Sequence, residues 1–141
     1  MMEITANAVQ TVAVNQAVLF TETAVAGNIS MIHREGSGLV GLRGLTNGQR
    51  RARFLVTYGS NIAVPTGETV GPVSLAIAIN GEPVLTSQMI STPAAVDEYH
   101  NVGSSIFIDV PIGCCSQISV ENTSTIPVNV QNANLIIERV A

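Results

Sequence analysis

Apolar residues alternate with polar or small residues along much of this chain, and this period of two is the feature that most limits its fold. In VSLAIAINGEPV (residues 73–84), Leu or Ile at positions 75, 77 and 79 alternates with Ser or Ala at positions 74, 76 and 78. In SIFIDVP, Phe107 and Asp109 fall on the face opposite the branched aliphatic residues. Successive side chains of a β-strand point to opposite faces. The pattern therefore predicts half-buried strands, and a helical period of 3.6 is hard to find.

Turn residues separate these runs at short intervals. Asn80-Gly81 directly follows one run, and this dipeptide predicts a tight hairpin with positive φ angles. Gly and Pro recur between the other runs from 59 to 127. Several short strands at such spacing predict an all-β, antiparallel two-sheet sandwich. Only residues 84–102 are poorly patterned, and we expect them to form a long surface connection.

Low charge indicates that part of the surface is covered by other copies. Only 11% of the residues are charged, whereas about 25% is usual for a soluble domain. The chain has five aromatic residues, two Tyr and three Phe. A core of small aliphatic side chains buries less area per residue than one rich in rings. We therefore expect identical copies to shield one another.

Several segments resemble the tumour-necrosis-factor-like jelly roll, which complement globular heads and bacterial spore-surface proteins share. The matching parts are VENTS at 120–124, NANLII at 132–137 followed by Arg139, the hairpin at 71–84, and the Gly-containing turn and Tyr-bearing strand within 36–59. The resemblance implies a jelly roll over residues 14–141. Residues 1–13 are expected to be an N-terminal extension or a first strand involved in assembly.

The same resemblance implies a homotrimer with no catalytic residue, and we expect no metal and no cofactor. Its interface is expected along an apolar strand near the C-terminus, formed by Asn134, Leu135, Ile136, Ile137 and Val140. Family members act as ligands, adhesive heads or surface building blocks. We therefore expect a structural protein of a virion surface, such as a head fibre or a capsid decoration. A spore-surface head, or a glycan- or protein-binding module that uses loops 60–72 and 86–104, is the alternative.

Location and partners follow from the same interpretation. No segment is long and apolar enough for a transmembrane helix, and the first residues lack the pattern of a secretory signal. We expect synthesis in the cytoplasm and a final position on a virion or on a spore or cell surface. The chain has no collagen-like Gly-X-Y segment, so any stalk belongs to another chain or is absent. Besides other copies of the chain, a capsid, fibre or stalk protein is the expected partner, and no membrane or nucleic acid is expected.

Five of the six arginines fall within one stretch of 20 residues, and the chain contains no lysine. They are Arg34, Arg43, Arg50, Arg51 and Arg53. Pairing with carboxylates across strands or across a subunit interface is the favoured interpretation. An anion- or nucleic-acid-binding patch is the weaker one, because the chain carries a net charge of −4 and its aromatic residues are scattered.

The only two cysteines, Cys114 and Cys115, are adjacent. In an extended backbone their side chains point to opposite faces, so the pair cannot ligate one ion. Structural zinc sites need spaced cysteines or added histidines, and His33 and His100 are separate single residues. We expect small buried thiols. An intersubunit disulfide is the main alternative, ahead of a metal on a symmetry axis or a catalytic thiol.

Overall fold

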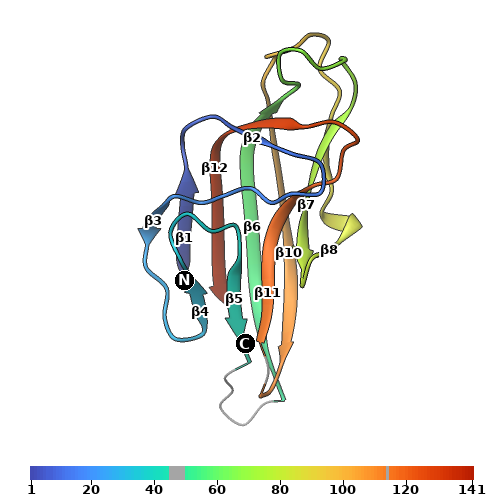
Figure 1. Ribbon diagram of the computed structural model, residues 1–141. Coiled ribbons are helices and arrows are strands. Elements are labelled where there is room, and N and C mark those ends of the chain that lie inside the picture. Colours follow the sequence, from blue (N-terminus) through green and yellow to red (C-terminus); the bar gives the residue numbers. More distant parts are fainter. Residues whose placement is uncertain (45–49, 114) are drawn as a thin grey trace.

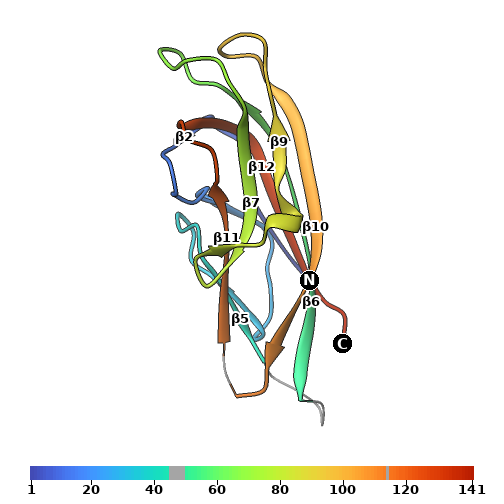
Figure 2. The ribbon, with the colours of Figure 1, turned by 90° about the vertical axis from the view of Figure 1, so that its right-hand side faces the viewer.

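Two antiparallel β-sheets face each other in the computed structural model, which describes residues 1–44, 50–113 and 115–141 (Figure 1). Figure 2 shows the two layers from the side. The strands of the first sheet, here called sheet 1, are β10 (His100–Pro111), β6 (Arg51–Ala63), β12 (Val128–Arg139), β1 (Met2–Ala6) and β3 (Glu22–Val25), in this spatial order, and β2 (Gln10–Val12) pairs with β12.

Sheet 2 lies opposite sheet 1. Its strands are, in order, β4 (Met31–His33), β5 (Val40–Arg43), β11 (Cys115–Asn122), β7 (Val73–Ile79) and β8 (Glu82–Pro83), and β9 (Met89–Ser91) pairs with β7. A 3-10 turn, η1 (Leu85–Ser87), joins β8 to β9. The chain crosses from one sheet to the other between β5 and β6, between β6 and β7, between β10 and β11 and between β11 and β12, as in a jelly roll. No helix in the described part of the chain could span a membrane.

The predicted hairpin is present. Asn80 and Gly81 have φ angles of 52° and 85°, so the turn uses the left-handed backbone region that this dipeptide favours. The Asn80 Oδ1 also accepts a hydrogen bond of 2.8 Å from the Gln117 backbone N–H. This bond ties the turn to β11, the neighbouring strand of β7.

The space between the sheets is filled mainly by aliphatic side chains. Phe54 and Tyr58, which face inward from β6, are 0% and 1% exposed. Phe20 packs edge-to-face on Tyr58 with ring centroids 6.3 Å apart. The alternation that the sequence predicts is therefore confirmed along β6 and β10, where buried or half-buried residues alternate with more exposed ones.

Strand β7 departs from simple alternation, because Ser74, Ala76 and Ala78 on its second face are buried as well. The segment from η1 to β9 folds back along β7. The Ser87 Oγ accepts a hydrogen bond from the Ile77 N–H at 2.9 Å, and Gln88 lies within hydrogen-bond distance of Ser74. The expectation of a surface connection over 84–102 is therefore wrong at η1, at β9 and at the start of β10.

A buried asparagine holds the end of β11 in place. The Asn122 amide donates hydrogen bonds to the carbonyls of Val12 (3.0 Å) and Ile126 (2.9 Å), and its Oδ1 accepts one from the Ser124 N–H (2.8 Å). Asn122 is 1% exposed. The VENTS segment thus connects β11 to the end of β2 and to the loop before β12.

The first residues belong to sheet 1. Strand β1 pairs with β12 on one side and with β3 on the other. Residues 2–6 are therefore an integral strand of the sheet, which corresponds to the first-strand alternative for residues 1–13. Their contribution to assembly stays a prediction.

Candidate assembly surface and exposed groove

The outer face of sheet 1 carries apolar side chains on β10, β6 and β12, at one edge of the sheet. On this face, Phe107 of β10 lies opposite Leu55 of β6. One step further along β6, Ile136 of β12 lies opposite Thr57. Phe107 is 65% exposed, while Leu55 and Ile136 are half-buried. The Phe107 ring is therefore largely exposed to solvent in the single chain, unlike the apolar side chains of the core.

Beyond these apolar residues the face is flat. Thr57 and Ser105 lie opposite each other with their hydroxyl oxygens 2.9 Å apart. In the next row Gly59 lies opposite Gly103, so two neighbouring strands present backbone alone. Glycines in a strand allow another backbone to approach closely. We call the outer-face residues Leu55, Thr57, Gly59, Gly103, Ser105, Phe107 and Ile136 the flat face.

The structure divides the five residues of the predicted interface strand. Asn134 and Ile136 lie on the outer face, and Val140, which is 45% exposed, follows the end of β12. Leu135 and Ile137 are 1% and 0% exposed and belong to the core. The prediction is wrong for these two, because alternation along β12 turns them toward sheet 2.

Two of the predicted arginines bind Asp109 across the ladder between β6 and β10. The Arg53 Nε and Nη2 donate hydrogen bonds of 2.8 and 3.1 Å to the two carboxylate oxygens, and the Arg51 Nε lies 3.2 Å from Oδ2. The cross-strand pairing that the sequence suggested is confirmed for this pair. The hydrogen bonds hold the pKa of Asp109 below its ordinary value and raise that of Arg53.

This ion pair lies beside the exposed ring. A hollow of about 330 Å³ is lined by Arg53, Phe107 and Asp109. The hollow adjoins one end of the flat face, beside the Phe107 ring.

The remaining arginines are elsewhere, so the predicted cluster is not one patch. Arg50 is exposed just before β6, whereas Arg34 and Arg43 lie on the outer face of sheet 2. The separation arises because the chain passes from β5 in sheet 2 to β6 in sheet 1 within the 34–53 stretch. Residues close in sequence are thereby sent to opposite layers.

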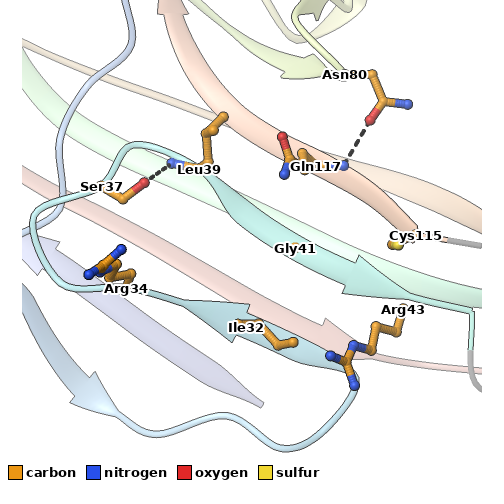
Figure 3. A pocket seen from close by; sticks show the side chains of 9 residues that line it. All are labelled: Ile32, Arg34, Ser37, Leu39, Gly41, Arg43, Asn80, Cys115 and Gln117. Atoms are coloured by element: carbon orange, nitrogen blue, oxygen red, sulfur yellow. Dashed lines mark hydrogen bonds between the residues drawn. The ribbon is translucent and has the colours of Figure 1, made fainter.

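Arg34 and Arg43 belong to a groove of about 560 Å³ over β4, β5 and β11 (Figure 3). Figure 3 shows the two arginines at opposite ends, with Gly41 between them. The lining residues are Ile32, Arg34, Ser37, Leu39, Gly41, Arg43, Asn80, Cys115 and Gln117. Among the described residues, neither arginine forms an ion pair with a carboxylate.

The prediction of buried thiols can be compared with the structure for Cys115 but not for Cys114. Cys115 is exposed, lies opposite Arg43 and lines the groove. The expectation of a buried thiol is therefore wrong for Cys115 in the single chain. Cys114 lies outside the described residues, and a disulfide between copies stays a prediction.

The histidines occupy unrelated positions. The His33 Nε2 lies 2.9 Å from the Ser37 carbonyl oxygen, and the His100 Nε2 lies 3.3 Å from a Glu98 carboxylate oxygen. Within the described ranges, no three His, Cys, Asp or Glu side chains converge as metal ligands would.

The two segments proposed as recognition loops are shorter than expected. Residues 60–63 belong to β6 and residues 100–104 belong to β10. The connection from β6 to β7 and the connection from β9 to β10 lie together at one end of the molecule (Figure 1). There the Thr66 hydroxyl donates a hydrogen bond to Asp97.

Comparisons with known proteins bear on the fold. No protein-family model matches the sequence, and no curated protein sequence matches it. The globular domain of the zebrafish complement 1qA protein superposes with a TM-score of 0.64 and 12% identity, over 99% of this chain and 96% of that one. Murine APRIL superposes with a TM-score of 0.61 and 8% identity, over 97% and 98%. The chain therefore has the TNF-like jelly-roll fold that its sequence resembles.

Proposed function

We propose that this chain is a non-enzymatic structural protein that forms a homotrimer through the outer face of sheet 1. The observation that carries the proposal is Phe107, which is 65% exposed at one end of the flat face, on the edge strand β10. Around it, glycines and hydroxyl side chains leave a surface on which another copy can pack closely. The TNF-like fold supports this arrangement, because the sequence resemblance implies a trimer around apolar strand faces.

The size of the face suits a stable interface. Sheet 1 has five strands in its main path, and its longer strands reach 12 residues or more. At about 4.8 Å between strands and about 3.3 Å per residue, the 46 residues of these five strands cover about 730 Å². This area is on the order of the roughly 800 Å² that each partner of a stable complex buries.

We further propose that the trimer is a building block of a virion surface, as a head fibre or capsid decoration. The low fraction of charged residues supports a role in an assembly, since a protein that is free in solution normally carries more surface charge. A spore-surface head is the alternative with the same trimer.

Two experiments test the proposal. Light scattering of the purified protein at micromolar concentration should give three times the chain mass of 14.7 kDa, and a monodisperse monomer would reject the trimer. Immunogold labelling of purified virions and of spores then separates the two locations, because only the assembly that contains the protein should be decorated.

A further inference from the structure

The groove on the outer face of sheet 2 has a charge that nothing in the described part of the chain neutralises. Arg34 and Arg43 are both exposed and form no ion pair there, whereas Arg51 and Arg53 share Asp109. We propose that this groove binds an extended acidic segment of a different protein, with two carboxylates four residues apart.

The spacing of the arginines defines that pattern. The pairing of β4 with β5 places His33 opposite Val40, so Arg34 lies beside Leu39, and Arg43 follows four residues along. Four extended residues span about 13 Å. In a bound extended peptide, residues i and i+4 point to the same side at this same spacing. One carboxylate can therefore reach each guanidinium.

Residue i+2 of such a peptide also points into the groove. It would lie above Gly41, between the side chains of Ile32 and Leu39, each of which is 46% exposed. A Cβ atom built on Gly41 would lie no closer than 3.8 Å to its neighbours. The groove therefore has free space above Gly41, and a small apolar residue of the peptide, such as Val, fits there.

The groove can also bind a peptide backbone. The side-chain amides of Asn80 and Gln117 line it, and a carboxamide offers both donors and acceptors, which a peptide backbone needs.

The ligand segment has to come from another protein. The ten acidic residues of this chain include no pair separated by four positions, so a second copy cannot provide the pattern. The groove lies on the sheet opposite the flat face, and it stays accessible if the trimer forms as proposed. The inference therefore stands independently of the proposed trimer.

The test is a titration of the full-length protein, followed by its backbone amide NMR signals. The probe is an end-blocked peptide Glu-Thr-Val-Thr-Glu, and the control peptide is Glu-Glu-Thr-Val-Thr, which has the same composition and charge. We expect saturable shifts at the amides of Ile32, Gly41 and Gln117 with the first peptide, and weaker binding of the second.

Substitutions identify the groups responsible. Because an exposed ion pair contributes modestly, Arg34→Gln and Arg43→Gln should each weaken binding by about two- to fivefold, whereas Arg50→Gln removes the same charge elsewhere and should have no effect. Gly41→Gln should abolish binding by filling the groove, while the mass from light scattering stays that of the unsubstituted protein.

Three results would overturn the inference. They are the absence of saturable shifts at millimolar peptide, equal binding of the two peptides, and binding of a sulfated tetrasaccharide in place of the peptide. The last result would assign the groove to anionic sugars. None of them changes the mass that light scattering measures, so failure here is distinguishable from failure of the proposed trimer.

Discussion

Replacing Phe107 by Ala should separate the trimer into monomers without unfolding the chain. The side chain is 65% exposed in the single chain, and a Phe side chain has roughly 200 Å² of surface, so full burial between copies removes about 130 Å² from water. At about 25 cal/mol per Å², burial contributes about 3 kcal/mol per copy and about 9 kcal/mol per trimer as an upper limit.

Such a loss is measurable as a change in assembly. Because about 1.4 kcal/mol corresponds to a tenfold change, the equilibrium constant for trimer formation should fall by up to about 10⁶-fold. For a monomer–trimer equilibrium, the midpoint concentration changes with the square root of that constant and so rises by up to about a thousandfold. Sedimentation equilibrium over a range of concentrations measures this midpoint.

A matched substitution tests whether the location of the side chain matters. Leu39 is 46% exposed and lines the groove on the outer face of sheet 2, the sheet opposite the flat face. Leu39→Ala should leave the midpoint unchanged. The reasoning is refuted if Phe107→Ala assembles at the same concentration as the unsubstituted protein, or if both substitutions shift the midpoint equally.

Three further predictions concern buried and paired groups. Asn122→Ala removes the four hydrogen bonds of a buried amide and should lower the free energy of unfolding by about 3 kcal/mol; a loss below about 1 kcal/mol in urea titrations would contradict the role given to this residue. The Asp109 carboxyl should titrate below its ordinary pKa of 3.8 because Arg53 donates to it. Since this pKa is depressed on folding, the stabilisation is present above pH 3.8 and is lost as the pH falls through the folded-state value. An NMR titration of the carboxyl carbon should show the midpoint return toward 3.8 in Arg53→Gln, and an unchanged midpoint would argue against the pair. Burial raises the pKa of the Tyr58 phenol above its ordinary value of 10.0, so the folded state loses stability as the pH rises through 10. Comparison of the phenolate absorbance with that of Tyr58→Phe should therefore show no Tyr58 phenolate at pH 11 until the chain unfolds, and prompt ionisation of Tyr58 in the folded protein would contradict this.

The sequence predicted the sandwich because local patterns determine most of it. Alternation in SIFIDVP correctly placed Phe107 and Asp109 on the outer face, and Asn80-Gly81 correctly marked the hairpin. These features depend on neighbours in sequence, so they can be read without knowledge of the tertiary contacts.

The residues of β12 that face inward could not be predicted in the same way. In NLIIERV, Leu135, Ile136 and Ile137 are all apolar, so alternation does not reveal which of them face inward. Pairing with β6 decides the matter, since Leu135 lies opposite the buried Tyr58 and Ile137 opposite the buried Val56.

The arginine groove depended on topology. Arg34 and Arg43 could not be separated from Arg51 and Arg53 until the crossover from β5 to β6 was known. One local signal was present, because Gly41 within an apolar strand marks a position where a backbone or ligand can approach closely.

The most direct test of the account is an experimental structure of the assembly that the protein forms in solution. The account predicts three copies in which the Phe107 rings are buried against neighbouring copies and the outer faces of sheet 1 turn toward one axis. A structure in which Phe107 stays exposed, or in which copies meet through sheet 2, would contradict it.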